Sequence, residues 1–128
     1  MIDNSKMTDF VRDLRRAYNA VVNEVDIRYY TKRELLELAL MKPADSFYLS
    51  EDDVQRIINQ IEKGNIEVKK PITALKYHDL YSVYNQYLED LPYLPKIMAI
   101  RMTADGPAPR FYITADWARK VLNKYIRI

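Results

Sequence analysis

The chain of 128 residues has no cysteine, two glycines and one histidine. Without cysteine there are no disulfides, no thiol catalysis and no zinc–thiolate sites. Because glycine is scarce and 48% of the residues are hydrophobic, the composition indicates a folded core and argues against disorder or low complexity. No run of 18 apolar residues exists, so we expect no membrane-spanning helix.

Motifs of enzymes are missing as well. The single histidine, His78, lies in no metal-binding or triad pattern, and there is no glycine-rich phosphate loop. The acidic clusters 51–53 and 89–90 are explained by the start of one helix and the solvated end of another. We therefore predict a protein that is not an enzyme, with no catalytic residues, no metal and no cofactor. The first residues, MIDNSKMTDF, do not form a secretory signal, so we expect a cytoplasmic protein.

An internal repeat organises the chain. The stretch 43–61, PADSFYLSEDDVQRIINQI, recurs 64 positions later as PAPRFYITADWARKVLNKY over 107–125. A second match at a spacing of 66 aligns Leu14 and Tyr18 with Leu80 and Tyr84. We interpret the chain as an internal duplication, with unit 1 at about 8–64 and unit 2 at about 71–128.

Apolar spacing and capping residues predict about six helices. Residues three and four apart indicate a helix over 8–25 and another over about 73–91. Thr31, with Glu34 as a capping box, starts a helix that ends before Pro43, and Ser50 starts one that stops at Gly64. Two more follow, over about 96–103 and after the cap Thr114.

The repeat and the helices together predict an all-α fold. A unit of about 64 residues buries only about 60% of its unfolded surface, so each unit alone would be marginal. We therefore expect a single domain over 1–128, in which two pseudo-symmetric three-helix units share one core. The units resemble helix-turn-helix motifs, although the turn is longer than the standard one. The repeated PAxxFY segment is either a structural corner or the turn before a recognition helix.

Basic residues are gathered in the second unit. Residues 1–64 carry ten Lys/Arg and twelve Asp/Glu, whereas residues 65–128 carry ten and six, which gives +4. Positive charge favours an anionic partner, and bases spaced along one helix could contact phosphates and base edges. The candidate nucleic-acid-binding residues are Arg110, Arg119, Lys120, Asn123, Lys124 and Arg127. A solvated helix face explains the same residues equally well.

Aromatic residues suggest a second kind of partner. The chain has eleven tyrosines, five of them between Tyr77 and Tyr93, and one tryptophan, Trp117. Tyrosine and tryptophan are enriched in protein interfaces, so Tyr77, Tyr81 and Trp117 are candidate partner-interface residues. The competing interpretation is that these rings cover a small core while their hydroxyls reach water.

The segment GPAPRFYITADWARKVL resembles a stretch found in small, uncharacterised helical proteins of bacterial phages and conjugative elements. The likeness covers about 20 residues of the second unit, and is carried by Pro107, Ala108, Pro109, Phe111, Tyr112, Ile113, Thr114, Ala118, Arg119 and Val121. The first unit matches more weakly over 43–58 and departs at Asp45 and Val54. The resemblance implies a helical protein of mobile-element origin and does not transfer an activity.

Two functions follow from these observations. The first is a DNA-associated regulator or accessory factor of a mobile element, with double-stranded DNA as its partner. The alternative is a module for protein–protein interaction or assembly, with a protein partner or a second copy of the chain docking on the tyrosine-rich helix and Trp117. Neither function involves a membrane.

Overall fold

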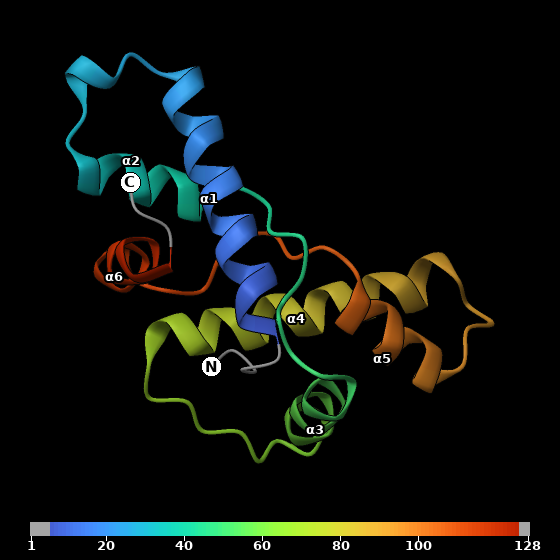
Figure 1. Ribbon diagram of the computed structural model, residues 1–128. Helices are drawn as coiled ribbons and strands as arrows, with labels where there is room; N and C mark the ends of the chain where they lie inside the picture. The colour runs from blue at the N-terminus through green and yellow to red at the C-terminus, as the bar shows by residue number, and fades with distance from the viewer. Residues whose placement is uncertain (1–5, 126–128) are drawn as a thin grey trace.

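The computed structural model describes residues 6–125, and these residues are predominantly helical with no strand among them. Helix α1 (Met7–Glu24) is followed by a short 3-10 helix, η2 (Ile27–Tyr29), and by α2 (Lys32–Leu40) and α3 (Glu51–Glu62). The chain continues through α4 (Pro71–Asp90), α5 (Lys96–Asp105) and α6 (Ala115–Tyr125) (Figure 1). The predicted all-α class with about six helices is confirmed, and η2 is the one helical element that the sequence patterns did not predict.

Side-chain caps fix where the helices begin. The Thr31 hydroxyl accepts a hydrogen bond from the Glu34 amide at 3.1 Å, and the Glu34 carboxylate accepts one from the Thr31 amide at 2.8 Å. This is the predicted capping box. The hydroxyls of Ser50 and Thr114 each accept from the backbone amide three residues later, at 3.1 Å in both cases. These bonds satisfy amides that no preceding turn can reach, so they set the direction of α3 and α6.

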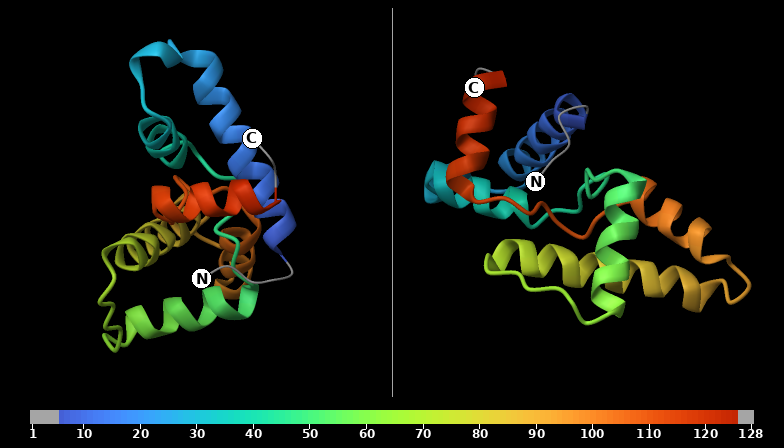
Figure 2. Two further views of the ribbon diagram at one scale, coloured as in Figure 1. Left: turned by 60° about the vertical axis from the view of Figure 1, so that its left-hand side comes forward. Right: turned by 90° about the horizontal axis from the view of Figure 1, so that it is seen from below.

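The third helix of each half packs on the first two helices of the other half, an arrangement that we call exchanged packing. Helix α1 packs on α2, and α4 packs on α5, so each half of the chain builds one helix pair. Helix α3 then packs on α4 and α5, whereas α6 packs on α1 and α2 (Figures 1 and 2). Each third helix therefore covers the helix pair of the other half. The buried side chains of all six helices form one cluster. The duplication and the pseudo-twofold relation between the halves stay predictions.

Two irregular segments, 41–50 and 106–114, cross in the middle of the molecule. At the crossing, the Ala44 amide donates to the Ala108 carbonyl at 3.0 Å, and the Ala108 amide donates to the Ala44 carbonyl at 2.9 Å. The two alanines are the same position of the two repeats, and both are buried. Their small side chains let the two backbones approach in the interior, where their polar groups must pair with each other.

The aromatic pairs of the repeats flank this crossing but differ in burial. Phe47 and Phe111 are both buried, as the repeat predicts. Tyr48 is buried as well, with a left-handed φ of 59°, whereas Tyr112 is half-buried. The burial predicted for the phenylalanines is therefore found at both positions, whereas the two tyrosines differ in burial. A positive φ is rare for a bulky residue and is kept only where the surroundings hold it.

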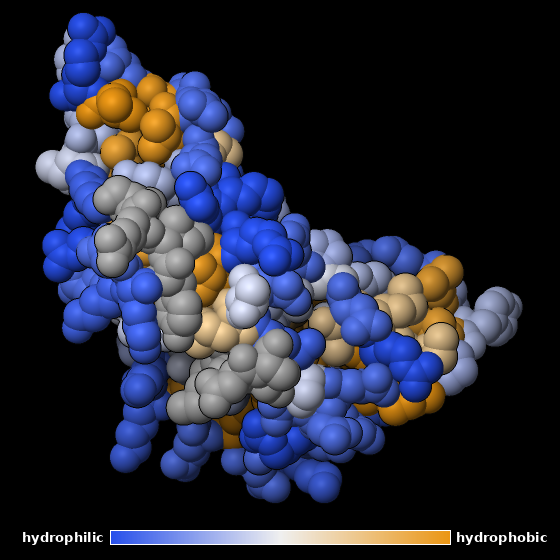
Figure 3. Space-filling model, in the orientation of Figure 1, coloured by the Kyte–Doolittle hydropathy of each residue, from blue (hydrophilic) through white to orange (hydrophobic). Residues whose placement is uncertain are grey.

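Apolar side chains reach the surface at the two ends of the molecule, over the turn between α1 and α2 and the turn between α4 and α5 (Figure 3). Ile27 is 51% exposed at the first turn, and Leu91 and Tyr93 are 47% and 98% exposed at the second. Among the described helices, none is both long enough and apolar enough to cross a bilayer.

The exchanged packing makes a prediction about the separated halves. When residues 1–64 and 65–128 are expressed apart, each lacks the helix pair on which its own third helix packs. We expect neither half to unfold cooperatively as a monomer, because the apolar face of α3, with Val54, Ile57 and Ile58, loses its cover. Mixing the halves should restore a cooperative transition, followed by circular dichroism. Two halves that fold cooperatively as monomers would show that the exchange is not needed.

The buried phenylalanines should each contribute strongly to stability. Phe47→Ala or Phe111→Ala should lower the free energy of unfolding by roughly 3–5 kcal/mol, because each change removes a buried ring and enlarges the empty space in the interior. Tyr93→Ala is the matched control, since this ring is 98% exposed and should change stability by less than about 0.5 kcal/mol. Urea denaturation measures all three variants, and a loss below about 1 kcal/mol at either phenylalanine would contradict the prediction.

Candidate functional site

The outer face of α6 carries most of the candidate nucleic-acid-binding residues. Arg119, Lys120, Asn123 and Lys124 are all exposed on this helix. Arg127 lies outside the described residues. Among the residues that the structure describes, neither Arg119 nor Lys120 has a carboxylate within 4.0 Å.

The acid nearest to this face in sequence is already engaged. Asp116 accepts a hydrogen bond from Arg33 of α2 at 2.8 Å. This ion pair ties α6 to α2, and Arg119 and Lys120 face solvent with no carboxylate partner in the part of the chain that the structure describes.

Helix α3, the counterpart of α6 in the first repeat, has a different charge pattern. Its one arginine, Arg56, pairs with Asp53 at 3.5 Å. Its acids reach towards α5, with Glu51 at 3.3 Å from Arg101 and Glu62 at 2.7 Å from Lys96. Because its one arginine is paired with an acid and further acids lie along the helix, α3 is a poor surface for a polyanion.

Arg110 is separated from the α6 face. It lies in the segment before α6, half-buried, and its Nε atom is 3.3 Å from Asp79 Oδ2 of α4. The geometry at this distance gives an ion pair but no hydrogen bond, so the buried Nε–H has no acceptor. Arg110 therefore pairs with α4 and is not part of the outer basic face of α6.

The candidate partner-interface residues serve mainly the interior. Tyr77 and Tyr81 are half-buried and pack against the core. Tyr81 also stacks on Tyr84 with 6.0 Å between the ring centroids. Trp117 is 38% exposed, and its ring centroid lies 5.9 Å from that of Phe10. Of the three candidates, Trp117 alone is classed as exposed.

Each repeated tyrosine is bonded to an aspartate of the first helix in its own half. The Tyr48 hydroxyl donates to Asp13 of α1 at 2.5 Å, and the Tyr112 hydroxyl donates to Asp79 of α4 at 2.7 Å. Burial, and then the bonded carboxylate, raises the pKa of both tyrosines. Asp13 also accepts from Arg16 and from the Asp45 amide, so a buried carboxylate is fully partnered there.

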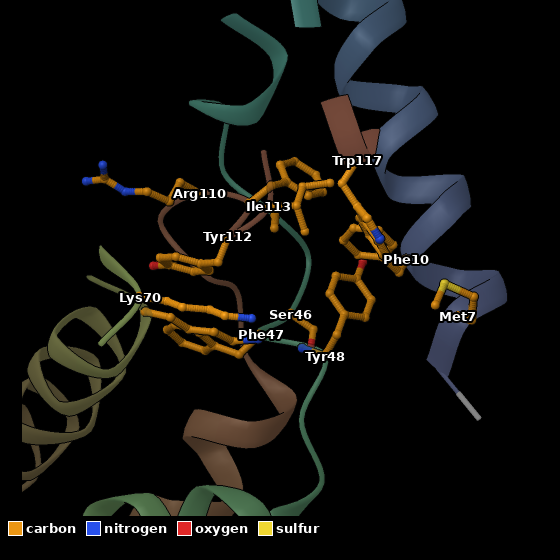
Figure 4. A pocket seen from close by; sticks show the side chains of 13 residues that line it. Met7, Phe10, Ser46, Phe47, Tyr48, Lys70, Arg110, Tyr112, Ile113 and Trp117 are labelled. Atoms are coloured by element: carbon orange, nitrogen blue, oxygen red, sulfur yellow. The ribbon is translucent and has the colours of Figure 1, made fainter. Parts of the chain in front are cut away.

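A cavity of about 390 Å³ lies beside the crossing. Its walls are largely aromatic, with the Tyr112 and Phe47 rings stacked 5.8 Å apart on one side and Trp117 against Phe10 on the other (Figure 4). Among the described residues, the lining also includes Lys70, Lys76 and Arg110, and no aspartate or glutamate. The walls of the cavity are therefore mainly apolar, and its charged side chains among the described residues are cations.

Lys76 is the most unusual of these residues. It is only 6% exposed, and its Nζ atom lies 5.9 Å from the centroid of the Tyr112 ring. Within the described residues, no carboxylate or hydrogen-bond acceptor partners this ammonium. Burial lowers the pKa of Lys76 from 10.5 to about 8, while the more distant charge of Asp53 acts in the opposite direction.

The sequence interpretation did not single out Lys76, Asp13 or Asp79, although the signals were present. Lys76 precedes Leu80 by four residues, and Leu80 precedes Tyr84 by four, so all three share the buried side of α4. Asp13 and Asp79 are separated by 66, the spacing of the matched leucines beside them. A charged residue at a position that the helical spacing predicts to be buried can thus be recognised from the sequence alone.

The chain matches no protein-family model, no curated protein and no solved structure. Within the described residues, no group of three or more histidine or acidic side chains is placed to hold a metal ion.

The buried ammonium makes a prediction about pH. In the folded protein the pKa of Lys76 is below that of the unfolded chain, so the unfolded state binds more protons between about pH 8 and 10.5. The stability of the wild type should therefore rise with pH across this interval. Below it, the charged lysine costs on the order of 3 kcal/mol.

Replacing the lysine tests this directly. Lys76→Met keeps the length of the side chain and removes the charge, so it should be more stable than the wild type at pH 7 by up to about 3 kcal/mol. The difference should shrink by about pH 9.5, measured by urea denaturation. Exposed Lys70→Met is the control and should stay within about 0.5 kcal/mol of the wild type. A difference between Lys76→Met and the wild type that is independent of pH would contradict the assignment.

Proposed function

We propose that the protein is a non-enzymatic, DNA-associated helical protein of the cytoplasm, a regulator or accessory factor of a mobile element. It contacts double-stranded DNA with the outer face of α6. The observation that supports this most is the exposure of Arg119 and Lys120 without an acidic partner among the described residues.

The charge balance supports the same face. Cations that are already paired with acids gain little from phosphate, because the acid repels the polyanion, whereas uncompensated cations release counterions on binding. Arg56 of α3 is paired with an acid, whereas Arg119 of α6 has no acidic partner within residues 6–125. Lys120 could contact phosphates, and Arg119 or Asn123 could reach base edges from an exposed helix.

Charge reversal on α6 tests the proposal. Arg119→Glu with Lys120→Glu should abolish binding to random duplex DNA at about 50 mM salt, because two phosphate contacts become repulsive. In the wild type, each phosphate contact should add about 0.9 to the slope of log affinity against log salt. The helical circular dichroism signal should not change, since both residues are exposed.

The matched control is Arg56→Glu on α3, which should weaken binding much less. A larger loss from Arg56→Glu than from the α6 double variant would place the contact on the first half. If the wild type does not bind duplex DNA at about 50 mM salt, the DNA proposal fails.

A protein-interaction module is the second candidate. It is favoured by the exposure of Trp117, which is 38% exposed although a tryptophan normally gains from burial. The partner in that case is another protein or a second copy of the chain, and analytical ultracentrifugation of the wild type and of Trp117→Ala distinguishes the second copy.

A further inference from the structure

The aromatic cavity beside the crossing has the features of a small-molecule site. Its volume of about 390 Å³ is within the range of roughly 300–1,000 Å³ that ligand pockets occupy. Phe47, Tyr112, Phe10 and Trp117 supply flat apolar walls from both halves of the chain. Such pockets bind the body of a ligand by apolar contact and use few polar groups to orient it.

The charges of the lining residues point to the ligand's polar group. Arg110 is compensated by Asp79 at 3.3 Å, and Lys70 is exposed to water. Lys76 is more than nine-tenths buried, lines the cavity, and has no carboxylate partner among the described residues. The Lys76 side chain is enclosed, but its Nζ atom keeps some accessible surface and can therefore meet an anion that enters the cavity. A carboxylate there would offset the cost of placing this charge in a largely apolar site.

We propose that this cavity binds a small aromatic monoanion, whose ring lies among Phe47, Tyr112 and Trp117 and whose carboxylate pairs with Lys76. One uncompensated buried charge fits a single negative charge on the ligand. The aromatic walls and the limited volume favour a ligand with a single ring or two fused rings over a ligand with a long aliphatic chain.

The cost of the buried ammonium supports this assignment. A protein that gains nothing from Lys76 would be more stable with an apolar residue there, because burial already lowers the pKa of this lysine. A lysine that destabilises the free protein and stabilises a complex is typical of a binding residue. The site does not depend on DNA binding, since α6 presents Arg119 and Lys120 to the outside and these residues do not line the cavity.

The test compares 2-naphthoate with its neutral isostere 2-naphthamide by isothermal titration calorimetry on the full chain. The wild type should bind the naphthoate at least about tenfold more tightly, because a hydrogen bond to a charged partner is lost with the amide. Naphthoate should also raise the melting temperature more than naphthamide does. Binding of neither compound, or equal binding of both, would overturn the proposal.

Variants then identify the group that reads the charge. In Lys76→Met the preference for naphthoate should fall to near one, while the amide still binds. In the control Lys69→Met, which removes an exposed lysine that does not line the cavity, the preference should stay within about threefold of the wild type. An equal loss in both variants would show that a diffuse positive field, and not Lys76, attracts the anion.

If Lys76→Met does not fold, judged by circular dichroism, the wild type still decides. A preference for naphthoate that persists unchanged at about 500 mM NaCl is expected for a buried ion pair, which salt screens little. A preference that disappears at this salt concentration would overturn the proposal.

Discussion

The backbone pair between Ala44 and Ala108 is the constraint on which the rest of the structure depends. Two irregular segments pass through the interior, where each amide and carbonyl must find a partner. They do so by bonding to each other, and the Phe111 amide adds a bond to the Leu40 carbonyl at 3.0 Å. Because the segments cross at buried alanines, the helices that follow them are directed to opposite sides. Each third helix therefore covers the pair built by the other half.

The crossing also explains why a cavity forms beside it. Two repeats bring two Phe-Tyr pairs to one place, and flat rings from different directions do not fill the space between them. The tyrosine hydroxyls are held by Asp13 and Asp79, which keeps the rings in position. The cations of the molecule thus lie in two different environments. Lys76 is enclosed beside the Tyr112 ring, and Arg119 is exposed to solvent, so the two residues suit ligands of different size.

Much of the local structure could be predicted from the sequence. Helix starts at Thr31, Ser50 and Thr114 follow from hydrogen bonds that span only three residues, and these form wherever the chain is placed. The helices and most of the core could also be predicted, because apolar residues spaced three and four apart lie on one face of a helix. The candidate site was predicted less well. Arg119 and Lys120 are exposed as expected, whereas Arg110, close to them in sequence, turns inward to Asp79.

The sequence by itself determined an all-helical chain, its caps and the burial of Phe47 and Phe111, because these depend on residues within a turn or on strongly apolar side chains. Only the tertiary structure decided which half each third helix covers, since that depends on how the segments at Ala44 and Ala108 cross. It also decided that Lys76 is enclosed with no carboxylate partner among the residues that the structure describes. A charge is buried or solvated according to what packs over it, and the residues over Lys76 come from parts of the chain far from it in sequence.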